Sequence, residues 1–316
     1  MTADPAPPPP RSGSFGSRAV VTIIAGGLFA AVCWADATAL FAAPTGWWLA
    51  PVAVLLAWGS GAEAVRLAAG QGLAPRGPLV PAAAAAVPLA AVAGASFPTV
   101  TGSGPAAGIG WAAVAATAGL AAILIAEIAG YRRGADGLAR VAGGSLAVAA
   151  IGMPLAFTVA LRLLGGAGGG GRGLLEPLMP LVSMVAVVKG GDIAAYLVGS
   201  TVGRHRMAPL VSPGKTWEGA VASLVASLAI AWLLLVASGL TARQPWGGWL
   251  VYGLLVGGAG MLGDLSESLV KRELAAKDSG SSLAGLGGFL DLVDAALFAA
   301  PVAWVLWVLG LAAGGG

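Results

Sequence analysis

The sequence predicts an all-α polytopic membrane protein, and three observations support this fold class. Of its 316 residues, 58% are hydrophobic and only 10% are charged, and the mean hydropathy is +0.87. An average soluble domain carries roughly 25% charged residues, so this composition is unsuited to a globular surface in water. The apolar residues are gathered in long runs, and the basic residues are concentrated in alternate connections between these runs.

A helix that spans a bilayer needs about 20 mostly apolar residues. Nine runs of this kind follow one another along the chain, and the third is rich in alanine. Glycine-rich or polar stretches separate them. We therefore expect about nine transmembrane helices, over residues 19–42, 47–66, 79–95, 109–129, 141–164, 175–199, 216–239, 247–270 and 289–313.

The positions of the basic residues predict the orientation of these helices. With the N-terminus in the cytoplasm, the outer connections hold only Arg172 and Arg243, and Arg162 and Lys189 lie inside helices. Cationic loops are retained on the cytoplasmic side, so this bias favours an odd number of spans with the C-terminus outside. The other thirteen basic residues lie on the inner side: Arg11, Arg18, Arg66, Arg76, Arg132, Arg133, Arg140, Arg204, Arg206, Lys215, Lys271, Arg272 and Lys277.

The chain divides into three parts. Residues 1–18 are proline-rich and predict a disordered cytoplasmic tail, with a secretory signal as the competing interpretation. Residues 19–174 hold about five membrane helices with few charges. Residues 175–316 hold about four helices with the cytoplasmic loops that carry most ionisable groups, and we expect this part to be catalytic.

The composition excludes several kinds of site. There is one cysteine, Cys33, and one histidine, His205. A disulfide within the chain, a Cys/His zinc cage and a histidine dyad are therefore excluded. The short basic loops follow the topology and predict no nucleic-acid-binding surface. Any chemistry must use carboxylates, lysines, arginines, hydroxyls and backbone groups.

Ionisable groups inside a membrane are costly, and they are by default a functional hypothesis. All four lysines lie after residue 188, together with eight of the fourteen acidic residues. In the predicted topology, four helix ends bring these groups to the cytoplasmic side. They could frame one polar cavity that is open to cytosolic solutes and still in contact with lipid.

The spacing of these groups predicts a phosphate and metal site. Asp264, Ser268 and Lys271 share one face of a helix, and Asp291 and Asp294 would be neighbours in the first turn of the last helix. Clustered carboxylates suit Mg²⁺, which also takes water and phosphate oxygens, and lysine supplies a point charge for phosphate. Ion pairs that only hold the helices together are the alternative, and carboxylates at a helix start also act as caps.

Two blocks of sequence carry a family resemblance. The first is Gly263-Asp264-Leu265-Ser266-Glu267-Ser268, Lys271-Arg272, Lys277-Asp278, Gly280, Gly287-Gly288, Asp291 and Asp294. The second is Asp192, Ala195-Tyr196, Gly199, Gly203, Ser212-Pro213 and Lys215-Thr216-Trp217-Glu218-Gly219. In order and spacing both resemble the phosphatidate cytidylyltransferases, also called CDP-diacylglycerol synthases. Elsewhere the resemblance is in hydropathy, with a weak match at Glu63 and Arg66.

The resemblance implies an enzyme that transfers CMP from CTP to phosphatidate, giving CDP-diacylglycerol and pyrophosphate for phospholipid synthesis. It implies Mg²⁺ as cofactor, with Asp264, Asp291 and Asp294 as ligands and Lys271 as a further catalytic residue. The lipid phosphate is already a nucleophile near neutral pH, so no catalytic histidine is needed. The implied substrate-binding residues are Ser212, Lys215, Thr216, Glu218, Ser268, Arg272, Lys277, Asp278, Gly287 and Gly288.

This chain departs from the family pattern at three positions. Ala284, Leu286 and Leu292 stand where the family usually has proline, histidine and arginine. A catalytically weakened paralogue that acts as a membrane partner is therefore one alternative. A CTP-dependent lipid kinase of the dolichol kinase type is another, and a cation-coupled transporter is a third. We expect an integral protein of a bacterial inner membrane with its site facing the cytoplasm; the sequence leaves open whether it is a homodimer.

Several other residues have simpler interpretations. We expect Arg162 to snorkel to the outer interface and His205 to be a solvated loop residue. Glu63 and Glu127 could pair with Arg66 and Arg132 or line the cavity. Abundant glycine and alanine indicate close helix packing, and five tryptophans lie near predicted membrane boundaries, where indoles prefer to sit: Trp47, Trp48, Trp111, Trp246 and Trp249.

Overall fold

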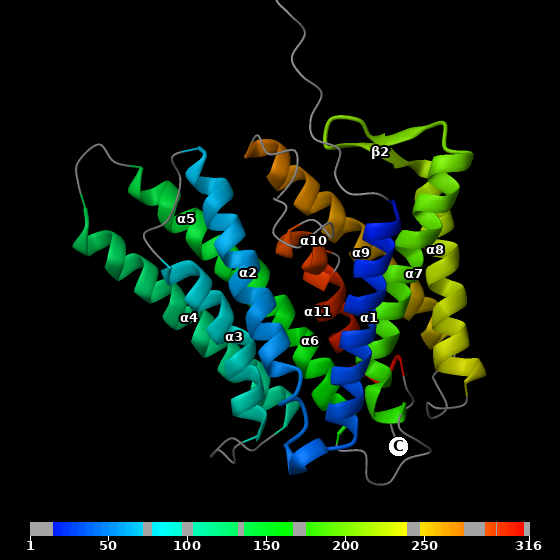
Figure 1. Ribbon diagram of the computed structural model, residues 1–316, viewed down its shortest axis with the longest axis horizontal. Helices are drawn as coiled ribbons and strands as arrows, with labels where there is room; N and C mark the ends of the chain where they lie inside the picture. Colours follow the sequence, from blue (N-terminus) through cyan, green and yellow to red (C-terminus); the bar gives the residue numbers. More distant parts are fainter. Residues whose placement is uncertain are drawn as a thin grey trace, which may run out of the picture.

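The computed structural model describes residues 15–71, 78–96, 104–131, 136–166, 175–238, 247–274, 288–294 and 296–312, with only the backbone over 15–23 and at 25. Helices of membrane-spanning length make up most of it (Figure 1). In chain order the α-helices are α1 (Phe15–Ala37), α2 (Ala50–Ala69), α3 (Leu79–Ser96), α4 (Pro105–Ala129), α5 (Gly137–Ala147), α6 (Met153–Leu164), α7 (Met179–Thr201), α8 (Trp217–Trp232), α9 (Gly248–Glu273), α10 (Phe289–Val293) and α11 (Ala296–Val308).

The predicted fold class is confirmed. In the described residues, eight helical segments are long and apolar enough to cross a membrane, and α1 adds a shorter described apolar stretch, Gly26–Ala37. The fifth predicted helix consists of α5, the π-helical turn Val148–Gly152 and α6. Single helical turns precede α2 and α7 (Leu40–Ala42 and Glu176–Leu178), and a second π-helical segment, Leu233–Ala237, extends α8.

Two local features differ from the predicted helices. The connection between α7 and α8 contains an antiparallel hairpin of β1 (Arg206–Ala208) and β2 (Ser212–Thr216). The ninth predicted helix is described in two pieces, α10 and α11, with residue 295 outside the described residues. Asp294 directly follows the last residue of α10.

The helices pack in two groups. Buried residues of α3, α4 and α6 form one apolar cluster, and a second, larger cluster joins α6, α7, α9 and α11. Small residues bring α7, α8 and α9 close together: a Cβ at Gly191 would lie 2.8 Å from the hydroxyls of Ser223 and Ser227. This confirms the predicted role of the small residues in helix packing. The division at residue 174 stays a prediction.

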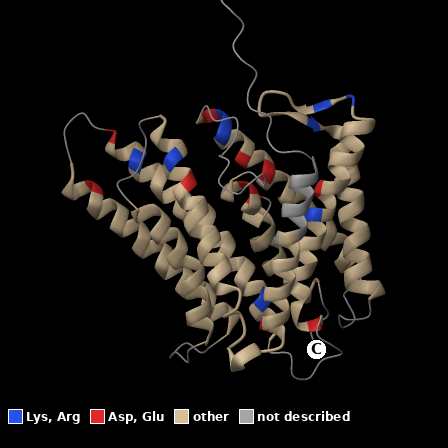
Figure 2. Ribbon diagram, in the orientation of Figure 1, with Lys and Arg blue, Asp and Glu red and all other residues tan. Residues whose placement is uncertain are grey.

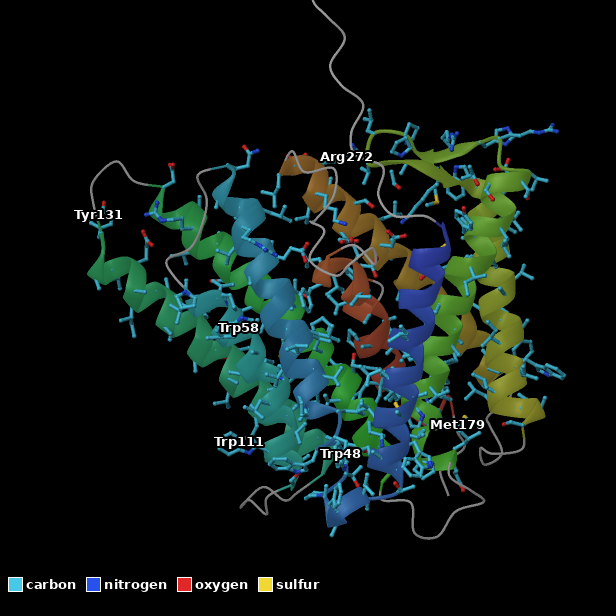
Figure 3. The ribbon with its side chains drawn as sticks, viewed as in Figure 1. Trp48, Trp58, Trp111, Tyr131, Met179 and Arg272 are labelled. Carbon is cyan, nitrogen blue, oxygen red and sulfur yellow. The ribbon has the colours of Figure 1, made fainter. Side chains whose placement is uncertain are left out.

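The two ends of the bundle differ in charge. Most lysine, arginine, aspartate and glutamate residues lie toward the end that carries the hairpin (Figure 2). The described part of the chain begins at that end, and its last helix, α11, runs toward the opposite end, as an odd number of passes requires (Figure 1). Trp48 and Trp111 lie at the opposite end from Tyr131 and Arg272 (Figure 3), in agreement with their predicted interfacial positions.

Arg162 is buried rather than snorkelling, which corrects the prediction from its sequence position. Its side chain is fully buried, and Nε lies 2.8 Å from Oδ2 of Asp36, which is equally buried. Nη1 donates to the carbonyl of Gly166 at 2.8 Å, while Asp36 accepts from the backbone N–H groups of Gly46 and Trp48 at 2.9 and 3.1 Å. This pair ties the end of α1 to the end of α6 and to the segment before α2, far from the hairpin.

Removing one member of this pair should destabilise the fold. In Arg162→Met the Asp36 carboxylate stays buried without its cation, and we expect the free energy of unfolding to fall by roughly 3–5 kcal/mol. Thermal unfolding of the purified protein in detergent measures this. The double variant Asp36→Asn/Arg162→Met leaves no buried charge and should be more stable than Arg162→Met alone; equal stability of the two variants would contradict this assignment.

Candidate functional site

A cavity of about 570 Å³ opens at the hairpin end of the bundle. Its walls come from α7, the hairpin, the first turns of α8 and the middle of α9. Polar groups of all four elements face it: Asp192 from α7, Ser212, Lys215 and Thr216 from β2, Ser223 from α8 and Asp264 from α9. Glycines of α7, the hairpin and α8 also line the cavity, where they leave room for a ligand next to the backbone.

Local hydrogen bonds fix the hairpin over this cavity. Thr216 is the N-cap of α8, and its Oγ1 accepts from the backbone N–H of Gly219 at 3.1 Å, as capping threonines do. The Glu218 carboxylate lies 2.6 Å from Nδ1 of His205 at the start of the hairpin. Nε of Arg272 on α9 donates to the carbonyl of Val211 at 3.2 Å. The hairpin is therefore anchored to both α8 and α9.

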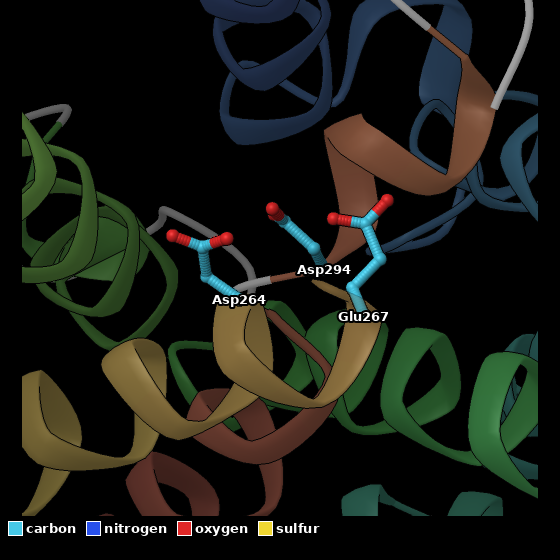
Figure 4. A group of neighbouring side chains, drawn as sticks. All are labelled: Asp264, Glu267 and Asp294. Atoms are coloured by element: carbon cyan, nitrogen blue, oxygen red, sulfur yellow. The ribbon is translucent and has the colours of Figure 1, made fainter. Parts of the chain in front are cut away.

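Three carboxylates meet beside the cavity. One oxygen from each of Asp264, Glu267 and Asp294 lies within 4.8 Å of the others (Figure 4). Asp264 and Glu267 are one turn apart on α9, and Asp294 joins them from the end of α10. Asp264 also lines the cavity. We call these three residues the acidic cluster.

Three lysines surround the acidic cluster. Lys215 of β2 lies 2.8 Å from Asp264, and Lys271 of α9 lies 2.7 Å from Glu267 and also pairs with Asp291. Lys189 of α7 approaches Asp294 at 4.0 Å, and it also lies 3.5 Å from Asp192. Five carboxylates and three lysines thus form one continuous network that joins α7, the hairpin, α9 and α10.

The N-terminus of α10 is held from two directions. Oδ2 of Asp291 accepts from the backbone N–H of Gly288, the N-cap residue, at 2.8 Å. Oε2 of Glu63, which is fully buried on α2, accepts from the backbone N–H of Leu290 at 3.1 Å. Free N–H groups at a helix start favour such carboxylate partners. Gly288 leaves the space for Glu63, because a Cβ at this position would overlap its carboxylate.

The structure brings together some of the predicted site residues. Asp264 and Asp294 lie in the acidic cluster, whereas Asp291 faces Lys271 and the N-terminus of α10. Ser212, Lys215 and Thr216 line the cavity. Glu218 and Arg272 contact the hairpin rather than the cavity. Gly288 contacts Glu63. Ser268 is half-buried on α9 and is not among the residues that line the cavity. Lys277, Asp278 and Gly287 lie outside the described residues.

Three residues of this region were missing from the predicted site. Glu267 completes the acidic cluster, and its membership in the sequence block with Asp264 could have indicated it. Asp192 faces the cavity, and it too belonged to a matching block. Glu63 accepts a hydrogen bond from the backbone N–H of Leu290, 227 residues away in the sequence. Glu127 pairs with Arg140, and His205, which is largely exposed as expected, pairs with Glu218.

A family model described as the cytidylyltransferase family matches residues 16–309. The chain belongs to this family. Its matched region includes every element of the cavity and of the acidic cluster. The family resemblance seen in the two sequence blocks is thereby confirmed.

Individual relatives match over a smaller region. A phosphatidate cytidylyltransferase of Brucella suis is 46% identical over 125 residues, which cover 40% of this chain and 45% of the relative. One from Mycobacterium bovis is 41% identical over 126 residues, 40% of each chain. An uncharacterized protein of Escherichia coli is 42% identical over 123 residues, 38% of this chain and 39% of that protein. The alignments thus span less than half the length of these relatives.

A methyl group at Gly288 should disturb the start of α10. In Gly288→Ala the new Cβ meets the Glu63 carboxylate, so that the hydrogen bond to Leu290 and the position of Asp291 must both change. We expect a lower unfolding temperature in detergent. Gly258→Ala on α9 is the matched control, because nothing lies within 4 Å of a Cβ there. Equal unfolding temperatures for the two variants would contradict the close contact.

Proposed function

We propose that this membrane protein transfers CMP from CTP to phosphatidate, giving CDP-diacylglycerol and pyrophosphate. The observation that carries the proposal is the position of Asp264. It lines a cavity that polar groups of four elements face, and it also belongs to the acidic cluster within a bundle of apolar helices. Membership in the cytidylyltransferase family and the names of the relatives support the same reaction.

The reaction needs positioning and charge neutralisation more than proton transfer. A phosphate oxygen of phosphatidate attacks the α-phosphorus of CTP, a new P–O bond forms, and the bond to the departing pyrophosphate breaks. The attacking and leaving oxygens are roughly in line, so the protein must hold two anionic substrates on opposite sides of one phosphorus. A site that combines lysines, hydroxyls and a cavity between membrane-spanning helices suits this task.

The acidic cluster fits a divalent cation. Its oxygens are the ligands that Mg²⁺ takes, usually with water and substrate phosphates. The network of five carboxylates and three lysines has a formal charge of minus two, which equals the charge that one such ion would neutralise. We therefore propose Mg²⁺ at Asp264, Glu267 and Asp294, where it would stabilise negative charge on the phosphates. Direct ligation by Asp291 stays a prediction.

The remaining residues take roles that follow from their positions. Lys215, Ser212 and Thr216 face the cavity and would bind the triphosphate of CTP from the hairpin. Lys271 would keep Glu267 and Asp291 in place and contribute positive charge near the reacting phosphates. Arg272 and Glu218 would act indirectly, through the position of the hairpin.

The alternatives make different products or need a different geometry. A CTP-dependent lipid kinase would release CDP and a phosphorylated lipid, and the relatives' names favour nucleotidyl transfer. A cation-coupled transporter would need carboxylates that are reachable from both sides, whereas most acidic residues here lie toward the hairpin end (Figure 2). A catalytically weakened paralogue is the third alternative, because Leu292 stands where the family usually has arginine. The other two departures, Ala284 and Leu286, lie outside the described residues.

Loss of a cluster carboxylate should remove Mg²⁺-dependent activity. The assay incubates purified protein with labelled CTP, phosphatidate and Mg²⁺ and identifies the lipid product. Asp264→Asn removes a charge shared by the cavity and the cluster, so we expect at least a hundredfold lower turnover, in the range of a lost electrostatic contact in a catalytic site. Asp136→Asn, an exposed position before α5, is the control. Unchanged turnover in Asp264→Asn, or no CDP-lipid from the wild type, would contradict the proposal.

We also propose that the hairpin end faces the cytoplasm of a bacterial inner membrane, since it holds most of the basic residues. Leu210, at the hairpin turn, is 92% exposed. In a Cys33→Ser background, Leu210→Cys should react with a membrane-impermeant maleimide in inside-out vesicles and stay unlabelled in intact spheroplasts. The reverse pattern would place the site on the outside.

A further inference from the structure

Lys189 stands apart from the other lysines in the described part of the chain. Its side chain is 51% exposed, whereas those of Lys215 and Lys271 are 23% and 16% exposed. Its two ion-pair distances, 3.5 Å to Asp192 and 4.0 Å to Asp294, are also longer than the 2.8 Å and 2.7 Å contacts of Lys215 and Lys271. Its ammonium group is thus the one most available to an incoming anion.

The depth of Lys189 is unusual for a cation. It lies near the middle of α7, ten residues after the first residue of that helix. A charged group at such a depth costs several kcal/mol in a lipid-facing helix and commonly marks a functional site. Two long contacts with Asp192 and Asp294 compensate part of this cost and leave donor capacity unused, since an ammonium group has three N–H donors.

Lys189 lies at the border of the cavity, beside the acidic cluster, because its partner Asp192 lines the cavity and Lys189 itself does not. Lys215 reaches Asp264 from the hairpin and lines the cavity, whereas Lys189 reaches Asp294 from α7 and does not line it. An in-line displacement needs the donor and the acceptor on opposite sides of the phosphorus. If the cavity holds CTP, the position of Lys189 suits the acceptor phosphate.

The surroundings of Lys189 suit a lipid. Ile193 follows it at i+4 on the same face of α7, Leu197 lies one further turn along, and both are exposed. The same face carries Asp192 and Tyr196, which line the cavity, so the apolar surface runs along the cavity's border. An exposed apolar face on a membrane-spanning helix offers a surface for acyl chains. A cation at one end of that face, beside the acidic cluster, offers a partner for the phosphate of the same molecule.

We propose that Lys189 binds the phosphate of the acceptor lipid, phosphatidate, at a subsite formed by α7 and the end of α10. This inference rests on the proposed function and deepens it by naming the acceptor subsite. The apolar face at Ile193 and Leu197 then accommodates the start of an acyl chain, and the two substrates approach the acidic cluster from two different elements.

Steady-state kinetics with each substrate varied in turn test this subsite. In detergent–phosphatidate mixed micelles, Lys189→Met should raise the KM for phosphatidate roughly tenfold or more, the effect of losing one hydrogen bond between charged groups. The KM for CTP should change by no more than about twofold, because Lys189 makes no contact with the nucleotide in this arrangement. Lys189→Arg keeps the charge and should restore most of the affinity. Arg204→Met, which removes an exposed charge near the hairpin, should leave both KM values unchanged.

A binding measurement separates this inference from the proposed function. Short-chain phosphatidate with Mg²⁺, in the absence of CTP, should raise the unfolding temperature of the wild type and of Lys189→Arg but not of Lys189→Met. This readout needs no turnover, so it decides the role of Lys189 even if no CDP-lipid is formed. Lys189→Gln replaces Lys189→Met in both measurements if the latter fails to fold.

Three outcomes would overturn the inference. The first is an unchanged KM for phosphatidate in Lys189→Met. The second is an increase in the KM for CTP instead, which would assign Lys189 to the nucleotide. The third is a fall in kcat with both KM values unchanged, which would mean that Lys189 only neutralises Asp192 and Asp294. A wild type that binds phosphatidate without forming CDP-diacylglycerol would refute the proposed reaction and leave the lipid subsite standing.

Discussion

The arrangement of this site depends on the mutual repulsion of carboxylates that are held inside an apolar bundle. Asp264, Glu267 and Asp294 have oxygens within 4.8 Å of one another, and Glu267 is only 8% exposed. Like charges at this separation disfavour the ionised state unless cations compensate them. Three lysines supply part of the compensation and leave a formal charge of minus two. A divalent cation, as we propose for this site, would neutralise that remaining charge. The geometry of the network is defined by helices that come from distant parts of the chain.

In the reaction that we propose, the same network would separate the routes of two very different substrates. A nucleotide is soluble and reaches the cavity from the hairpin end, where β2 presents Lys215 and two hydroxyls. A lipid phosphate is carried by acyl chains and must reach the cluster along the surface of a membrane helix. Asp264, which lines the cavity, would lie nearer the nucleotide, and Asp294, which Lys189 approaches, would lie nearer the lipid phosphate. The hairpin is fixed by contacts at Val211, Thr216 and Glu218, so the nucleotide side needs little rearrangement to become ordered.

The sequence predicted the helices well because length and hydropathy decide which segments can span a bilayer, and all nine predicted segments are helical in the described residues. It predicted the site in outline, since the two motif blocks contain Asp264, Asp294 and Lys215. Features that depend on long-range contacts were missed. The burial of Arg162 depends on its ion pair with Asp36, 126 residues away. Hydropathy alone favoured snorkelling instead. The short hairpin lies within a polar connection between two predicted helices, where hydropathy does not distinguish a strand pair from a loop.

Glu63 explains why the charge-poor N-terminal helices matter to a site built from the C-terminal half. Its fully buried carboxylate on α2 accepts the backbone N–H of Leu290, and it occupies space that Gly288 leaves open. The backbone N–H at the start of α10 satisfies part of the hydrogen-bonding capacity of this buried carboxylate. The position of α10 in turn sets the positions of Asp291, which pairs with Lys271, and of Asp294, which completes the acidic cluster. The N-terminal bundle thus acts as a rigid support that places two acidic groups against α9, although none of its described side chains lines the cavity.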